Sequence, residues 1–199
     1  ARPLRGGVDL VTQTVHPLQT HWDAALKAKA SDIRLIALDV DGIMSDGRLY
    51  FSASGDELKA FNILDGLGLK QLMQAGITVA VITGRRSPLT ERRMSDLGIP
   101  HLMQGREDKK VALLELIRDM NLAPEQIAYM GDDLPDLPAL RFAGLGITVP
   151  NGYWLVQQHA DYCTRSPGGQ GAVREACDLL LWAQGPLDNT LAPYLAAPA

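Results

Sequence analysis

Two aspartates, Asp39 and Asp41, flank a single valine directly after an apolar run that begins at Ile33. Carboxylates this close together repel each other, and each loses hydration when it lies in a cleft. Acidic side chains held in this way can act as a nucleophile, as a general acid or base, or as ligands of a hard cation. An isolated Asp-x-Asp can also be a solvated turn, so its meaning depends on which other polar residues accompany it.

Other polar residues end or follow the remaining apolar runs of the chain. They are Thr83, Gly84 and Arg85 after the run at 77–82, Lys109 at the start of a predicted helix, and Asp132 and Asp133 after the run at 126–130. Three or four carboxylates, a hydroxyl and an ammonium would then share one crevice. Because a carboxylate can attack phosphorus while a hydroxyl and an ammonium bind the phosphate oxygens, this set suits phosphoryl transfer.

Each group in such a site would have its own role. Asp39 and Asp132 can supply oxygen ligands to Mg²⁺, which prefers a few carboxylates and keeps several waters. Asp41 is placed to protonate the leaving alcohol and then to deprotonate the attacking water. Thr83 and Lys109 can bind phosphate oxygens. In this hypothesis, the bound cation relieves the repulsion between the two neighbouring acids.

The elements that must position these residues alternate between strands and helices. Strands are predicted at 33–38, 77–83, 99–104, 126–130, 145–149 and 160–164, and helices at 65–74, 87–98, 109–120, 135–143, 153–159 and 172–183. This alternation predicts an α/β fold with a doubly wound, Rossmann-like parallel sheet. Ligands of such folds lie at the carboxyl ends of the strands, where the polar residues gather.

The segment between Asp41 and Thr83 has room for one β-hairpin, one helix and one strand, so no cap domain is expected. We predict an N-terminal arm at 1–30, one catalytic domain at 31–184 and a C-terminal tail at 185–199. An uncapped site must exclude water in another way, and an adjoining subunit would do so. The hairpin at 48–61, with Tyr50, Phe51 and Phe61, is the expected contact between subunits, although it can equally be a flap on its own domain.

Composition narrows the classes of function. The 199 residues carry a net charge of −4 and are 46% hydrophobic, which fits a soluble globular protein without a nucleic-acid footprint. No apolar run reaches the length of a membrane span, and the four scattered histidines do not suggest a zinc site. Cys163 and Cys177 are expected to be buried free thiols in a reducing cytoplasm.

Four short motifs resemble those of the haloacid dehalogenase superfamily of phosphatases. They are "DVDG", "TGR", the lysine of "EDKK" and "GDDLPD". The resemblance spans about residues 33–185 and extends to "DELKAFN", "DGLGLK" and "GAVREACDLLL", which are similar to the uncapped members that act on sugar acid phosphates. It implies a cytoplasmic, homotetrameric, Mg²⁺-dependent phosphatase that releases an eight-carbon 3-deoxy sugar acid from its 8-phosphate during lipopolysaccharide precursor synthesis.

The resemblance also assigns roles by position. Asp39 would be the nucleophile and a metal ligand, Asp41 the general acid/base and a metal ligand through its backbone carbonyl, and Asp132 the third metal ligand, supported by Asp133. The residues implied in substrate binding are Asp41, Asn62, Ile63, Leu64, Asp65, Gly66, Lys70, Gly84, Arg85, Arg93 and Lys109. Arg85 and Arg93 would meet the sugar carboxylate, for which guanidinium groups are well suited.

Two features depart from the pattern, and three alternative functions stay open. Gln170 stands where a basic residue is expected, and the tail is poor in basic residues although the tail of the resembling enzymes reaches a neighbouring active site.

A nine-carbon sugar acid 9-phosphate is an alternative substrate. A phosphoacceptor signalling domain uses similar residues in another order, with its adjacent acidic pair first. A silent scaffold is disfavoured because every motif position keeps a competent side chain.

Overall fold

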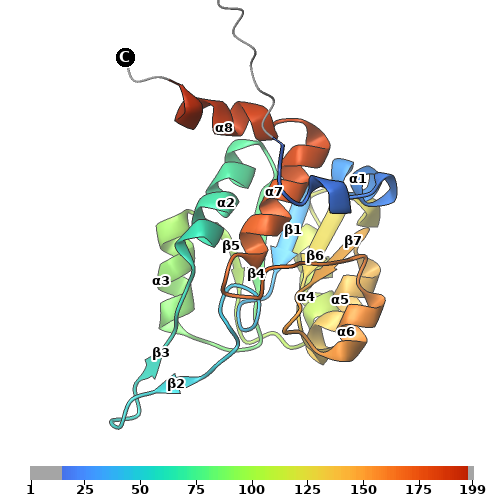
Figure 1. Ribbon diagram of the computed structural model, residues 1–199. Coiled ribbons are helices and arrows are strands. Elements are labelled where there is room, and N and C mark those ends of the chain that lie inside the picture. The colour runs from blue at the N-terminus through green and yellow to red at the C-terminus, as the bar shows by residue number, and fades with distance from the viewer. Residues whose placement is uncertain (1–14, 197–199) are drawn as a thin grey trace, which may run out of the picture.

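Six parallel strands form the central sheet of the computed structural model, which describes residues 15–196 (Figure 1). In spatial order they are β5 (His101–Met103), β4 (Thr78–Ile82), β1 (Leu35–Leu38), β6 (Ile127–Met130), β7 (Leu145–Thr148) and β8 (Tyr162–Cys163). The chain leaves β1 toward β4 and β5 and later returns to the other side of β1 through β6. The predicted doubly wound parallel sheet is confirmed.

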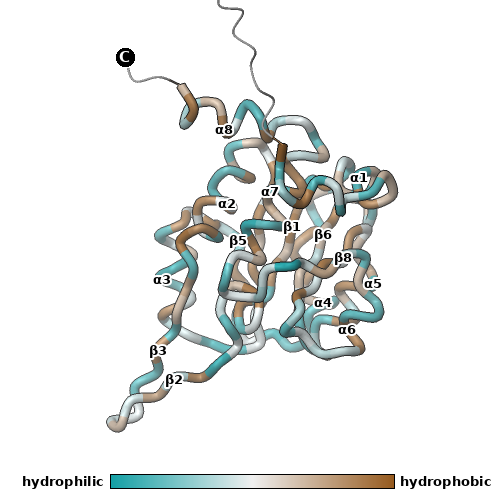
Figure 2. The backbone as a smooth tube through the Cα atoms, viewed as in Figure 1, coloured by the Kyte–Doolittle hydropathy of each residue, from teal (hydrophilic) through white to brown (hydrophobic). Residues whose placement is uncertain are grey.

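Helices cover both faces of the sheet because alternate strand residues point to opposite sides. On β1, Ile36 and Leu38 pack into one core and Leu35 and Ala37 into the other. The first face is covered by α1 (Ala24–Ser31), α2 (Ile63–Gln74), α3 (Pro88–Leu97) and α7 (Ala172–Gln184), and the second by α4 (Lys109–Ile117), α5 (Leu137–Phe142) and α6 (Trp154–His159). Hydrophobic residues accordingly follow the interior strands (Figure 2).

A two-stranded hairpin, β2 (Tyr50–Phe51) with β3 (Glu57–Leu58), lies between β1 and α2 and extends away from the body of the domain (Figure 1). The interval between Asp41 and Thr83 therefore holds one hairpin, one helix and one strand, as predicted. The predicted helix at 135–143 is divided into η3 (Leu134–Asp136) and α5, and two further 3₁₀ turns are η1 (Gln19–His21) and η2 (Pro124–Gln126).

Both ends of the described chain pack against the domain. Trp22, Leu26 and Ala30, which lie in the segment predicted as an arm, belong to the core on the α7 side. The tail forms α8 (Leu187–Leu195), of which Leu187 is buried, at the end of the molecule opposite the hairpin (Figure 1). Residues 1–14 of the predicted arm and 197–199 of the predicted tail lie outside the described residues.

The two cysteines are free, but only Cys177 is buried, whereas Cys163 on the edge strand β8 is exposed. The prediction of burial is therefore wrong for Cys163, because β8 has a neighbour on one side only. None of the helices between residues 15 and 196 has the length and apolar character that a membrane span requires.

Asp65, in the first turn of α2, connects this helix to the first turn of α7. Its side chain is 2% exposed, and its Oδ1 accepts a hydrogen bond of 2.9 Å from the backbone amide of Arg174. The other carboxylate oxygen has no hydrogen-bond partner among the described residues. Burial raises the pKa of Asp65 to about 6, although the hydrogen bonds from the α7 backbone oppose this shift.

This pKa shift makes the stability of the protein depend on pH. Since the carboxyl of Asp65 has a pKa of about 3.9 when unfolded, the folded state binds the proton more tightly. Its stabilising contribution is present below about pH 4 and is lost as pH rises through about pH 6. Relative to Asp65→Asn, the wild type should lose on the order of 2–3 kcal/mol of unfolding free energy between about pH 4 and about pH 7.

Urea unfolding of both proteins at several pH values measures this difference. A difference in unfolding free energy that stays constant across that range would contradict the assigned pKa.

Candidate active site

Three neighbouring strands, β4, β1 and β6, end side by side, and each is followed by a polar residue. Asp39 follows β1, Thr83 follows β4, and Asp132 lies two residues after β6. These residues line one cavity at the carboxyl edge of the sheet, together with Asp41 and Lys109. The convergence predicted from the sequence is therefore present in the fold.

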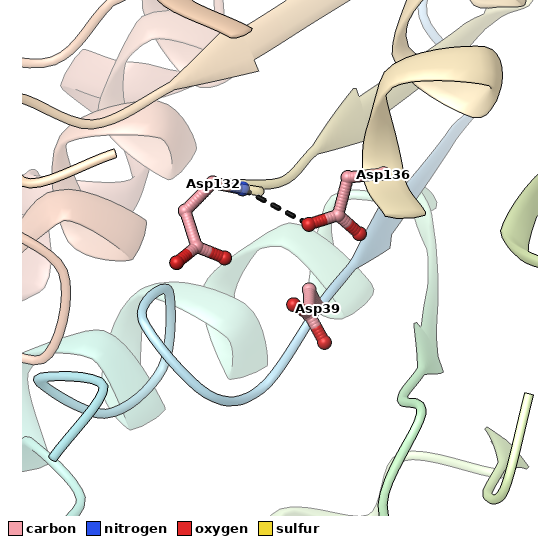
Figure 3. Close-up of side chains that lie close together, drawn as sticks. All are labelled: Asp39, Asp132 and Asp136. Atoms are coloured by element: carbon pink, nitrogen blue, oxygen red, sulfur yellow. Dashed lines mark hydrogen bonds between the residues drawn. The ribbon is translucent and has the colours of Figure 1, made fainter. Parts of the chain in front are cut away.

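Three carboxylates meet at the floor of the cavity. Oxygen atoms of Asp39, Asp132 and Asp136 lie within 4.8 Å of one another, and Asp136 points toward the other two from η3 (Figure 3). The Lys109 Nζ lies 3.0 Å from Asp39 Oδ1 and donates a hydrogen bond of 2.9 Å to Asp136 Oδ1. The backbone amide of Asp132 donates to Asp136 Oδ2 at 3.0 Å. Asp136 thus holds together the lysine and the loop that carries Asp132.

The electrostatics of this cluster show an excess of negative charge. Burial raises the pKa of Asp39 well above its ordinary value, and the charge of Asp136 adds to this, while Lys109 opposes it. Burial, followed by the charges of Asp136 and Asp133, raises the pKa of Asp132 to about 7. Burial alone would lower the pKa of Lys109, but Asp39 and Asp136 raise it. One ammonium does not neutralise this many buried carboxylates.

The donor set fits a hard divalent cation. Asp132 Oδ1 is buried and has no hydrogen-bond partner among the described residues, so this oxygen is free to act as a ligand. Gly42 lets Asp132 approach the loop of Asp39, because a Cβ on Gly42, whose φ is +89°, would lie 1.9 Å from Asp132 Oδ2. Carboxylate oxygens are the ligands that Mg²⁺ prefers.

The loop after β1 is held by its own hydrogen bonds and by a second loop. The backbone amide of Val40 donates to Asp39 Oδ1 at 2.7 Å, which fixes the carboxylate. Asn151 bridges the two loops, because its Nδ2 donates to the Gly42 carbonyl at 3.3 Å and its Oδ1 accepts from the Gly168 amide at 2.8 Å. The segment around Gly168, which leads to the exposed Gln170, therefore supports the loop after β1.

The mouth of the cavity contains further predicted residues. Gly84, Arg85 and Asp133 also line the cavity. Arg85 reaches toward the hairpin, where its Nη2 lies 3.1 Å from Glu57 Oε1. The Asp41 carboxylate accepts a hydrogen bond from the Lys59 ammonium, which also comes from the hairpin.

A second group of predicted residues does not line this cavity. It comprises Asn62, Ile63, Leu64, Asp65, Gly66, Lys70 and Arg93. Asn62 caps α2 by accepting a hydrogen bond of 2.8 Å from the Leu64 amide, and this is why the helix begins at Ile63 rather than at Asp65. The Ile63 side chain is 81% exposed, and the Arg93 guanidinium donates to the Asn62 carbonyl at 3.4 Å. Their role in substrate binding stays a prediction.

Three residues of the site were not predicted from the sequence. Asp136 ends the "GDDLPD" motif, a clear signal that also fits an acidic helix start. Tyr129, fully buried, donates a hydrogen bond of 2.6 Å to Asp136 Oδ1, and within an apolar strand it looks like a core residue. Lys59 is the lysine of "DELKAFN", a segment of the family resemblance, which assigns this lysine no role.

Comparisons with known proteins agree with this geometry. Residues 95–175 match the model of the haloacid dehalogenase-like hydrolase family. The chain is 50% identical over 166 residues to the 3-deoxy-D-manno-octulosonate 8-phosphate phosphatase KdsC of Escherichia coli strain BL21-DE3, covering 83% of this chain and 88% of that protein. It is 47% identical over 185 residues to KdsC of Salmonella typhi, covering 93% and 96%.

Solved structures give the same result. The crystal structure of 3-deoxy-D-manno-octulosonate 8-phosphate phosphatase from Moraxella catarrhalis, in complex with a magnesium ion, a phosphate ion and KDO, matches with a TM-score of 0.83 at 49% identity, over 84% of this chain and 97% of that one. The cobalt-bound phosphatase of Haemophilus influenzae matches with a TM-score of 0.79 at 39% identity, over 84% and 99%.

The fold and the site thus define a haloacid dehalogenase-like hydrolase. Within that class, the chain belongs to the family of 3-deoxy-D-manno-octulosonate 8-phosphate phosphatases.

Removing the charge of Asp39 tests the carboxylate cluster. Asp39→Asn should lower turnover by about 10³-fold or more, since a neutral amide oxygen is a far poorer nucleophile than a carboxylate oxygen. The same change should raise the melting temperature in chelator, because it removes a carboxylate whose charged form is disfavoured by burial and then by the charge of Asp136. Steady-state kinetics and thermal unfolding measure the two effects, with Asp56→Asn on the exposed hairpin tip as the matched control. Near-normal activity of Asp39→Asn would refute the assignment.

Proposed function

We propose that this protein is a Mg²⁺-dependent phosphatase that hydrolyses 3-deoxy-D-manno-octulosonate 8-phosphate to the free sugar acid and phosphate. The observation that carries the proposal is the cluster of Asp39, Asp132 and Asp136 around Lys109 at the carboxyl edge of the sheet. The fold that holds this cluster is similar to that of a solved 3-deoxy-D-manno-octulosonate 8-phosphate phosphatase. In lipopolysaccharide precursor synthesis the reaction would take place in the cytoplasm, which we propose as the location of this chain.

The reaction proceeds in two steps through Asp39. In the first, an Asp39 oxygen attacks phosphorus, the bond between phosphorus and the sugar oxygen breaks, and Asp41 gives its proton to that oxygen. In the second, Asp41 takes a proton from a water that attacks the aspartyl-phosphate, and phosphate leaves. Thr83, which is 2% exposed at the end of β4, and Lys109 bind the phosphate oxygens as negative charge builds up.

Asp39, Asp132 and the backbone carbonyl of Asp41 would hold the Mg²⁺, with Asp133 in support. When bound, this ion neutralises phosphate oxygens that would otherwise be repelled by the acids around them. Asp136 is engaged by Lys109 and by two backbone amides, so in this proposal it orients Lys109 and the Asp132 loop rather than the ion.

The sugar acid would extend toward the hairpin. Arg85 lies at the mouth of the cavity, and a guanidinium there suits the carboxylate of the substrate. Arg93, Lys70 and residues 62–66 lie outside the cavity of a single chain. We propose that they contact the part of the substrate that projects beyond it.

We further propose a homo-oligomer, a tetramer by family resemblance, in which the hairpin contacts another subunit. Phe51 and Leu58 on the hairpin are 61% and 63% exposed, and Leu49 beside it is 54% exposed. Apolar side chains that gather on a projecting element favour a protein contact. Phe61, by contrast, packs against the core.

The carboxylate-reading role of Arg85 can be measured directly. A charge-assisted contact is worth about 1.5–3 kcal/mol, so Arg85→Ala should lower kcat/KM for the sugar acid 8-phosphate by about 10-fold to 100-fold. The loss on p-nitrophenyl phosphate, which has no carboxylate, should be much smaller. Equal losses on both substrates would mean that Arg85 does not contact the sugar acid.

The substrate and the metal need a separate experiment. Phosphate release from a panel of sugar phosphates should be fastest with 3-deoxy-D-manno-octulosonate 8-phosphate, and a faster reaction with a nine-carbon sugar acid 9-phosphate would redirect the proposal.

Chelation should abolish activity and added Mg²⁺ should restore it, since the carboxylate cluster otherwise repels the phosphate. Full activity in chelator would rule out the metal.

A further inference from the structure

The returning strand of the hairpin presents one side to the active site. Glu57 and Lys59 are two residues apart and therefore point the same way, whereas Leu58 between them points outward and is 63% exposed. Glu57 contacts Arg85 at the cavity mouth, and the Lys59 ammonium donates a hydrogen bond to Asp41 Oδ1. Two polar residues of the hairpin thus contact two residues of the proposed machinery.

Lys59 is buried to an unusual degree for a lysine. Its side chain is 5% exposed, and buried ammonium groups need a partner because they lose their hydration. Among the residues that the structure describes, the Asp41 carboxylate is the group that accepts from Lys59 and pairs with it. A lysine placed only for solubility would extend into water instead.

Asp41 depends on Lys59 in turn. Within residues 15–196, the Asp41 carboxylate accepts no hydrogen bond other than the one from Lys59. Asp39, in contrast, is fixed by the Val40 amide at 2.7 Å and by Lys109 at 3.0 Å. The nucleophile is therefore oriented from the sheet, while the acid/base is oriented from the hairpin.

We propose that Lys59 is a positioning residue that orients Asp41 for proton transfer to the leaving group. The ammonium holds Oδ1, which leaves the other carboxylate oxygen to face the ester oxygen of the substrate. As the phosphorus–oxygen bond breaks and the Asp41 proton moves to the leaving oxygen, negative charge develops on Asp41 beside the ammonium of Lys59. Lys59 keeps its own protons throughout. This inference rests on the acid/base role of Asp41 in the proposed function.

This role has a signature that a merely structural lysine lacks. Protonation of the leaving group matters most when the departing alcohol is a poor leaving group, and less for p-nitrophenol. A loss of Lys59 should therefore slow phenyl phosphate and sugar phosphate more than p-nitrophenyl phosphate. It should act on kcat rather than on KM, since Lys59 is engaged by Asp41 and not by the phosphate.

The experiment compares Lys59→Met, Lys59→Arg and the control Arg48→Met, which removes an exposed hairpin cation. Because general acid catalysis contributes about 10²–10⁴-fold, Lys59→Met should lower kcat on phenyl phosphate by about 10-fold to 100-fold. KM should stay within about threefold, and the loss on p-nitrophenyl phosphate should be at least about fivefold smaller. Lys59→Arg should recover most of the activity, and Arg48→Met should match the wild type on both substrates.

Equal losses on the two aryl phosphates, a change confined to KM, or wild-type kcat in Lys59→Met would each overturn the inference. If circular dichroism shows that Lys59→Met does not fold, Lys59→Gln, which keeps a polar end in the buried site, is measured against the same criteria. The aryl phosphates contain no sugar, so the proposed substrate is tested separately. A wild type that cleaves them but not the sugar acid 8-phosphate would overturn the substrate and not the role of Lys59.

Discussion

The repulsion among buried carboxylates at the end of β1 and β6 is the constraint on which the rest of this site depends. Carboxylate oxygens of Asp39, Asp132 and Asp136 lie within a few ångströms of one another. In the described chain, Lys109 is the one lysine whose ammonium group contacts two of these carboxylates, those of Asp39 and Asp136. Burial raises the pKa of Asp39 and of Asp132, and the charge of Asp136 adds to both shifts. A divalent cation would balance this charge and would then allow a phosphate group to bind, and this is why the cluster favours phosphoryl transfer.

The fold makes this arrangement possible by placing three loops at neighbouring strand ends. Because β4, β1 and β6 are adjacent, short loops suffice to bring Thr83, Asp39 and Asp132 together. The apolar residues of the strands are buried on both faces, which gives these loops a rigid base. Asn151 and Gly168 then support the loop after β1 from its far side.

Sequence reasoning could predict what depends on local pattern. The doubly wound sheet, the hairpin and the convergence of Asp39, Asp41, Thr83, Lys109 and Asp132 all follow from alternating elements and strand-end residues. It could not identify what depends on long-range contacts. Tyr129 looks like any strand residue until its hydroxyl is seen to reach Asp136, and nothing near Trp22 in the chain shows that it packs into the core.

The same reasoning explains why the proposed phosphate-binding residues follow more directly from the sequence than the proposed sugar-binding residues. Thr83, which we propose binds phosphate, follows a strand end whose position follows from the topology, whereas Lys70 and Arg93 lie on helices and do not line the cavity. Where a substrate extends beyond the strand ends, its contacts depend on the hairpin and on neighbouring subunits, which local pattern does not describe.

The central claim is that an Asp39 oxygen becomes bonded to the phosphorus of the substrate. A crystal structure of the protein with Mg²⁺ and beryllofluoride, which mimics a phosphoryl group, tests this most directly. The account predicts that beryllium is bonded to a carboxylate oxygen of Asp39, with Thr83 and Lys109 contacting the fluorines. Beryllium bonded to any other residue, or held without a bond to Asp39, would contradict it.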